Sequence, residues 1–168
     1  RPPSEANSFL LRLTSGCSHN QCSFCAMYKD VQFAILSEKQ IEAQIVSAAK
    51  YREHVRRIFL CDGDALVLSS AKLLTILQRL YQEFPRLQRV ASYAAPRNIL
   101  AKTADELCQL KDAGLQLLYF GLETGDEVLL RTIRKGVTAV EAIKAGQMVK
   151  AAGMKLSVTI INGLAGAA

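Results

Sequence analysis

Short apolar segments alternate along this chain with longer segments in which apolar residues recur every three or four positions. This pattern predicts strands at residues 9–14, 57–61, 88–93, 116–121 and 155–161, and helices at residues 37–54, 70–84, 103–113 and 138–152. Capping-box sequences, with Gln or Glu three positions after the cap, start three of the helices at Ser37, Thr103 and Thr138. Strands that are apolar along most of their length and alternate with helices indicate a parallel sheet covered by helices. Such an α/β chain winds either into a barrel or into an open doubly wound sheet.

Polar residues and cysteines fall directly after the predicted strands. Three cysteines follow the first strand, Asp62-Gly63-Asp64 follows the second, Arg97 and Asn98 follow the third, and Glu123 follows the fourth. In both architectures, ligands bind at the carboxyl ends of parallel strands. The sequence therefore predicts a functional site at this edge of the sheet.

The composition is that of a folded globular domain. The chain has 168 residues, of which 50% are apolar and 21% are charged, which suits one domain and excludes a disordered chain. Its apolar runs are far shorter than the roughly 18 residues of a membrane span, so we expect no membrane partner. Five cysteines, clustered in part and without a secretory leader, indicate metal binding in a reducing compartment, and we expect a cytoplasmic protein.

The net charge of +6 suggests a nucleic-acid partner, but the positions of the cations argue against it. Many cations fall at helix ends or at helix-to-strand turns, opposite the predicted site, where they complement helix dipoles: Lys50, Arg52, Arg56, Arg57, Arg79, Arg86, Arg89, Lys111, Lys150 and Lys155. We therefore expect a small-molecule or peptide substrate rather than RNA.

Three cysteines with the spacing C-x4-C-x2-C, Cys17, Cys22 and Cys25, form the strongest candidate site. Thiolates are soft ligands that suit zinc or iron–sulfur clusters. One interpretation is a zinc-stabilised binding module with His19 as the fourth ligand. Another is a [2Fe–2S] electron-transfer protein with Cys61 or Cys108 as the fourth ligand, although both are otherwise expected to be small core residues. The third is a [4Fe–4S] cluster with three protein ligands and one open iron.

The cysteine segment also resembles a known family. Residues 16–29, Gly-Cys-Ser-His-Asn-Gln-Cys-Ser-Phe-Cys-Ala-Met-Tyr-Lys, are similar to the cluster loop of radical S-adenosylmethionine (SAM) enzymes. The similarity is greatest to the branch with the elongator catalytic subunit, the methylthiotransferases and oxygen-independent coproporphyrinogen oxidase. The family spacing is C-x3-C-x2-C, so this loop has one additional residue between its first two cysteines.

The resemblance implies roles for the residues near the cluster loop. Cys17, Cys22 and Cys25 would bind a [4Fe–4S] cluster, and Phe24 occupies the aromatic position near the adenine of SAM. Asp62, Gly63 and Asp64 stand where the family has Gly-Gly-Glu, which receives the methionyl amine of SAM. A carboxylate and a backbone carbonyl suit this role because an ammonium group has three donors and no acceptor.

The resemblance extends to the later strands. Glu123, after the fourth strand, matches the position whose polar side chain reaches the SAM ribose or nearby groups. Lys135 matches a basic position that pairs with the SAM carboxylate, and the neighbouring Arg134 is the alternative. Thr159 lies where a ribose contact is expected, and Ile161 begins the segment that backs the adenine.

The family resemblance also implies a fold and an activity. We expect a partial TIM-type (β/α) barrel, truncated after the fifth strand, with residues 1–168 forming an incomplete radical SAM core domain that lacks the C-terminal part of the barrel. The implied activity is reductive cleavage of SAM to a 5′-deoxyadenosyl radical that acts on an unidentified substrate. A reductant such as flavodoxin or ferredoxin would supply the electron.

Overall fold

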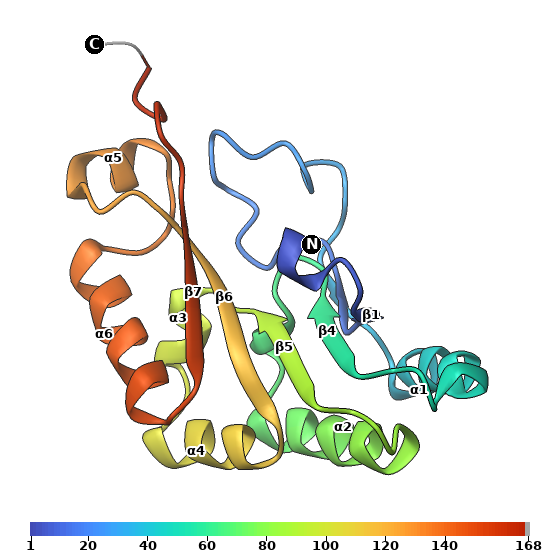
Figure 1. The fold of residues 1–168 in the computed structure, drawn as a ribbon. Helices are drawn as coiled ribbons and strands as arrows, with labels where there is room; N and C mark the ends of the chain where they lie inside the picture. The colour runs from blue at the N-terminus through green and yellow to red at the C-terminus, as the bar shows by residue number, and fades with distance from the viewer. Residues whose placement is uncertain (167–168) are drawn as a thin grey trace.

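A parallel sheet of five strands forms the centre of the protein, as seen in a computed structural model that describes residues 1–166 (Figure 1). The strand order is β1-β4-β5-β6-β7, with bounds Phe9–Arg12, Arg57–Cys61, Arg89–Tyr93, Leu115–Glu123 and Lys155–Ile160. Within residues 1–166 this order never reverses, so it lacks the switch point of a doubly wound sheet and follows the winding of a barrel. The described sheet is open, with β1 and β7 as its edges. The prediction of a parallel α/β sheet of partial-barrel type is thus confirmed.

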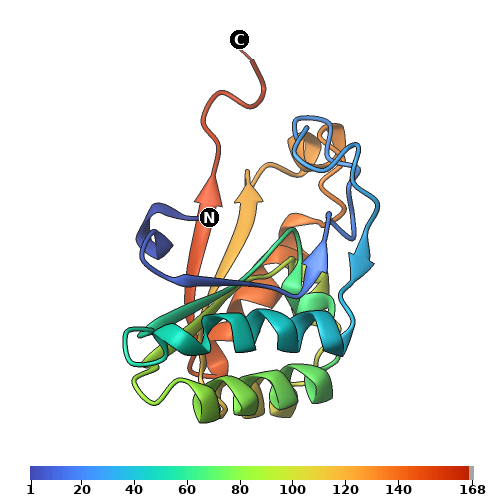
Figure 2. The same cartoon turned by 90° about the vertical axis from the view of Figure 1, so that its right-hand side faces the viewer.

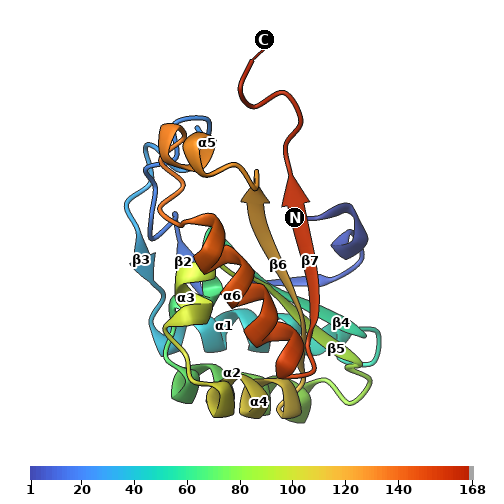
Figure 3. The ribbon, with the colours of Figure 1, turned by 90° about the vertical axis from the view of Figure 1, so that its left-hand side faces the viewer.

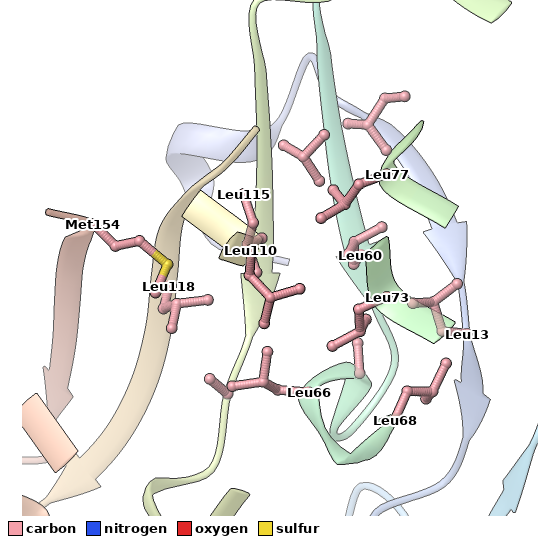
Figure 4. Packing of buried hydrophobic residues seen from close by; sticks show 14 of the residues in the cluster. Leu13, Leu60, Leu66, Leu68, Leu73, Leu77, Leu110, Leu115, Leu118 and Met154 are labelled. Atoms are coloured by element: carbon pink, nitrogen blue, oxygen red, sulfur yellow. The ribbon is translucent and has the colours of Figure 1, made fainter. Parts of the chain in front are cut away.

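Helices cover the outer face of the sheet (Figures 1 and 3). They are α1 (Glu38–Ala48), α2 (Ser70–Glu83), α4 (Ala104–Asp112) and α6 (Ala139–Ala151). Between these helices and the sheet lies the main apolar core (Figure 4), which includes the fully buried Leu60, Leu73, Leu77, Leu110, Leu115 and Leu118. The apolar positions that predicted α2 at helical spacing therefore pack against the sheet as expected.

All three predicted capping boxes form. The side chains of Ser37, Thr103 and Thr138 each accept a hydrogen bond from the third amide of their helix, and the Gln or Glu at that position bonds back. The first helix is shorter than predicted, because its α-helical part ends at Ala48 and a 3-10 turn, Ala49–Tyr51, follows.

Several short elements were not predicted. They are α3 (Pro96–Leu100), α5 (Glu127–Thr132), the 3-10 turns Pro3–Glu5 and Ala65–Val67, and the antiparallel pair β2 (Thr14–Ser15) and β3 (Ala34–Ile35). The β2–β3 pair splits the strand predicted at residues 9–14. These elements have too few residues to display a hydrophobic period, so they depend on tertiary contacts.

The prediction that Cys108 is a core residue is wrong. Cys108 lies exposed on α4, whereas Leu107 and Leu110 of the same helix face the core. Cys61 is partly buried and packs against a second, smaller cluster on the inner face of the sheet. Within the described part of the chain, no helix has the length and apolar character to cross a membrane.

The N-terminal segment, residues 1–8, lies on the inner face of the sheet, on the side away from α6 (Figure 3). Its Glu5 side chain is fully buried and accepts hydrogen bonds from Ser8, Arg89 and Tyr119. Burial by itself raises the pKa of Glu5, but these hydrogen bonds and the charge of Arg89 together lower it below its ordinary value.

We expect a Glu5→Gln variant to lose about 1–3 kcal/mol of unfolding free energy at neutral pH, because charged hydrogen bonds are weakened. The pKa of Glu5 is lower in the folded than in the unfolded protein. Its contribution is therefore present above the unfolded value of 4.5 and is lost as the pH falls through the folded pKa. Urea unfolding at several pH values gives the unfolding free energies of the wild-type protein and the Glu5→Gln variant. The difference between them should become smaller at acidic pH.

The control is Glu42→Gln, at an ion pair between Glu42 and Arg79 on the outer surface. Surface pairs contribute roughly 0–1 kcal/mol, so its effect should be small at every pH. The expectation would be contradicted if the difference in unfolding free energy between the Glu5→Gln variant and the wild-type protein were the same at neutral and acidic pH.

Candidate functional site

A cavity of about 740 Å³ lies where the cysteine loop meets the carboxyl ends of the strands. We call it the site cavity. Every residue that the family resemblance assigns to the cluster or to SAM lines it: Cys17, Cys22, Phe24, Cys25, Asp62, Gly63, Asp64, Glu123, Lys135, Thr159 and Ile161. A hollow of about 920 Å³ lies at the opposite end of the sheet, and none of these residues lines it. The fold thus gathers segments more than a hundred residues apart at one edge.

The cysteine loop, residues 16–33, is held over this edge by hydrogen bonds to later segments. Ser23 N donates to the Ile133 carbonyl at 2.9 Å, and His19 Nε2 lies 2.7 Å from the Arg134 carbonyl oxygen. Figure 2 shows the loop, in blue, beside α5 at the same end of the molecule. The segment after α5 therefore helps to place the three thiols.

Gly63 gives the loop its closest contact with the sheet. Its amide donates to the carbonyl of Gly16 at 3.1 Å, directly before the first cysteine. A Cβ atom at Gly63 would lie 2.4 Å from that carbonyl oxygen and 2.8 Å from Cα of Cys17. The turn after β4 and the cysteine loop can therefore approach this closely only because position 63 has no side chain.

Asp64 links the loop to the segment after β5. Its carboxylate is almost completely buried, and Oδ2 accepts hydrogen bonds from Ser18 of the loop and from Asn98, with Arg97 at 3.6 Å. The other oxygen, Oδ1, is buried and has no hydrogen-bond partner among the described residues. An unpaired carboxylate oxygen is costly to bury, so this atom fits a site that takes a cationic donor from a ligand.

Lys135 and Glu123 form an ion pair at the edge of the site cavity. Lys135 Nζ donates to Glu123 Oε1 at 2.8 Å, and both side chains are largely buried. The ammonium also lies 5.9 Å from the ring centre of Phe24. Nearby, Ile161 N donates to the Glu123 carbonyl at 2.9 Å, while Thr159 and Ile161 have exposed side chains.

Asp62 faces a different set of groups. Its carboxylate lies 3.5 Å from the Arg12 guanidinium, and burial together with a hydrogen bond to Asp62 raises the pKa of Tyr28. Sequence reasoning missed Ser18 and Tyr28, because neither residue type stands out in a polar loop. Only the contacts with Asp64 and Asp62 reveal them.

Backbone strain also concentrates here. Among the described residues, the positive-φ positions that are not glycine are Asn20, Asp62, Glu123 and Arg134, with φ between 46° and 72°. All four lie in the cysteine loop or in the segments that meet it. Such conformations cost energy for residues with a side chain and persist where surrounding contacts enforce them, as at binding sites.

The three loop thiols are free and partly buried. The pKa of Cys22 is raised, chiefly because the thiol is buried. The nearby Lys135 opposes this shift, and the neighbouring thiols Cys17 and Cys25 add to it. Within residues 1–166, no three His, Cys, Asp or Glu side chains are close enough to hold a single metal ion. Three free thiols around one cavity are a donor set that suits an iron–sulfur cluster.

Comparison with known proteins agrees with these features. A sequence model described as the Radical SAM superfamily matches residues 11–167. The chain belongs to the radical SAM superfamily. Enzymes of this superfamily use a [4Fe–4S] cluster and SAM. No curated protein sequence matched the chain.

Solved structures of radical SAM enzymes share the fold. The cobalamin-dependent enzyme OxsB has a TM-score of 0.74 and 19% identity, over 90% of this chain and 23% of its own. Methylornithine synthase (PylB) has a TM-score of 0.69 and 18% identity, over 94% and 45% of the two chains. Coproporphyrinogen III oxidase (HemN) of Escherichia coli has a TM-score of 0.65 and 17% identity, over 91% and 36%. This chain therefore spans less than half the length of each of these three enzymes.

Replacing Gly63 with Ala should displace the cysteine loop, since the added methyl group would overlap Gly16 and Cys17. We expect a loss of about 1–3 kcal/mol in unfolding free energy and a marked fall in the iron bound after anaerobic reconstitution. Iron and sulfide analysis and urea unfolding measure the two effects. The control is Gly125→Ala, because a Cβ atom there meets no atom within 4 Å. Equal iron content in both variants would show that the close contact at Gly63 does not position the thiols.

Proposed function

We propose that Cys17, Cys22 and Cys25 bind a [4Fe–4S] cluster and that SAM binds beside it in the site cavity. With an electron from a reductant, cluster and SAM bound together would supply radical chemistry by reductive cleavage of SAM, while the residues of this chain would bind, orient and shield them. The observation that carries the proposal is the convergence, in one cavity, of three free thiols with every residue assigned to SAM from the sequence. Membership of the radical SAM superfamily supports it.

The residues around the cavity would divide the recognition of SAM between them. Asp64 Oδ1, which is buried and lacks a partner within the described chain, is suited to accept a hydrogen bond from the methionyl amine. Lys135 would bind the SAM carboxylate, exchanging part of its pairing with Glu123 for the ligand. Because Lys135 and Glu123 already neutralise each other, the free site avoids an uncompensated buried charge.

The remaining contacts would hold the nucleoside. Phe24 lines the cavity beside Lys135 and would offer a ring face to the adenine. Glu123 and Thr159 have oxygen atoms for the ribose hydroxyls, and Ile161 would back the adenine. Asp62 and Gly63, which line the cavity next to Asp64, would offer backbone carbonyls to the amine.

We further propose a small molecule or peptide as substrate, a reductant such as flavodoxin or ferredoxin, and the cytoplasm as the compartment. Several cations away from the site cavity are engaged in ion pairs within the protein, which reduces the charge available to RNA: Arg52, Arg79, Arg86 and Lys111. Free thiols that must stay reduced to bind iron require a reducing environment.

Electron paramagnetic resonance of the anaerobically reconstituted, reduced protein tests the proposal. We expect a [4Fe–4S] signal that changes when SAM is added, and formation of 5′-deoxyadenosine in the presence of dithionite. Cys22→Ala should abolish both, whereas Cys108→Ala, at the exposed cysteine of α4, should leave both unchanged. Normal 5′-deoxyadenosine formation by the Cys22→Ala variant would refute the proposal.

An electron-transfer protein is the alternative that one observation favours, because Cys61 lines the same cavity as the loop cysteines. If Cys61 were the fourth ligand, no iron would remain open for SAM. The alternative then predicts a cluster signal insensitive to SAM and lost in a Cys61→Ala variant. The radical SAM proposal predicts that the Cys61→Ala signal is retained and still responds to SAM.

We expect Lys135→Met to weaken SAM binding about tenfold to hundredfold, the effect of losing one charge-assisted hydrogen bond. Equilibrium binding of SAM to the reconstituted protein measures this, with iron content checked in parallel. Lys144→Met, at an exposed lysine on α6 outside the cavity, is the matched control. Unchanged affinity in the Lys135→Met protein would remove this residue from the SAM site.

A further inference from the structure

The site cavity extends beyond the cofactor residues onto the inner face of the sheet. One half is lined by the cysteine loop and by residues that follow the strands, such as Asp62 and Asp64. The other half, which we call the inner half, is lined by Leu10, Cys61, Tyr93, Tyr119 and the N-terminal residues Pro2 and Pro3. No residue of the inner half is needed for the cluster or for SAM in the function proposed above.

The N-terminal segment is held against this face by one buried charge. Glu5 has no exposed surface, and its carboxylate accepts hydrogen bonds from Tyr119 at 2.7 Å and from Arg89 at 2.5 Å. The Tyr119 hydroxyl also bonds to the Ser4 hydroxyl at 2.7 Å. A carboxylate is buried in this way only if its partners offset the loss of hydration, so these contacts form one anchor.

Within residues 1–166, few other contacts hold the segment in place. Its side chains at Arg1, Pro3, Ser4, Ala6 and Asn7 are exposed, so it buries almost no apolar surface. The main core lies on the opposite face of the sheet and does not include this segment. The segment is therefore an element whose closure depends on the Glu5 anchor and whose opening leaves the core intact.

We propose that residues 1–8 form a wall of the inner half, that the Glu5 anchor holds this wall closed, and that the wall limits the size of the molecule that reaches the inner half as the substrate. The substrate role rests on the function proposed above, whereas the wall and its anchor do not. They can therefore be tested in protein without cluster or SAM.

Cys61 reports on access to the inner half, and the exposed Cys108 on the far side of the sheet is an internal reference. Reduced, cluster-free protein is pulse-labelled with iodoacetamide or with the bulkier fluorescein-5-maleimide. Peptide mass spectrometry then gives the labelling of Cys61 relative to Cys108 for each reagent. Comparing the two reagents cancels any change in the reactivity of the Cys61 thiol itself, so the comparison measures steric access.

We expect the wild-type protein to exclude the bulky reagent from Cys61 more strongly than the small one. Glu5→Gln should raise the ratio of Cys61 labelling to Cys108 labelling by fluorescein-5-maleimide, the bulky-reagent ratio, about tenfold. The reason is that the anchor loses its charge-assisted hydrogen bonds. Glu42→Gln, which alters the ion pair with Arg79 on the outer surface, should leave both ratios unchanged.

Tyr119→Phe provides a second variant that keeps the pair between Glu5 and Arg89 and removes only the bonds of the hydroxyl. It should raise the bulky-reagent ratio by a smaller factor, with an unchanged circular dichroism spectrum. If neither variant changes that ratio, or if wild-type Cys61 admits both reagents equally, the wall is refuted. Because no assay here involves iron or SAM, such a failure is distinct from failure of the proposed function.

Discussion

The close backbone contact between Gly63 and the Gly16–Cys17 segment is the constraint on which the site depends. It brings the first cysteine against the turn after β4 at a distance that excludes any side chain at position 63. The hydrogen bond from Ser18 to Asp64 can form only because the two segments already lie this close together. The thiols thus stand over the strand ends through contacts with the sheet, since the loop itself has no regular structure.

The outer face of the sheet carries the main core, and the inner face carries the site cavity. The outer face carries the leucine-rich core with the helices and provides most of the stability. The inner face carries a small aromatic cluster around Phe59, the site cavity and the buried carboxylate of Glu5. Because successive strands add in one direction, their carboxyl ends lie along a single edge, where residues from the cysteine loop to Ile161 meet. The site and the main core are therefore built from different faces of the same sheet.

Unfavourable features accumulate at the same edge. Asp62 and Glu123 adopt left-handed backbone conformations, and Asp64 keeps a buried oxygen that lacks a partner within residues 1–166. Each of these costs free energy that the outer core must offset. The Lys135–Glu123 pair differs from these features because each of its two largely buried charges has a partner of opposite sign. A ligand would have to compete with this pairing. Together these features describe a site whose polar groups are positioned before the ligand arrives.

The amino-acid sequence by itself determined the parallel α/β architecture, the long helices and the location of the site. Apolar runs and capping boxes are local signals, and the strand ends of any parallel sheet carry its ligands, so Cys17, Asp64 and Glu123 could be assigned to one edge. The sequence did not reveal short elements such as α3 and α5, because they lack a hydrophobic period of their own. Nor did it distinguish Cys108 from a core residue, since Leu107 directly before it and Leu110 two positions after it are apolar and Cys108 lies between them in the sequence. Only the tertiary structure decided that Glu5 is buried against Arg89 and that one oxygen of Asp64 is already used by the loop. Such pairings join residues far apart in the chain, and the packing of the sheet, rather than any local pattern, brings them together.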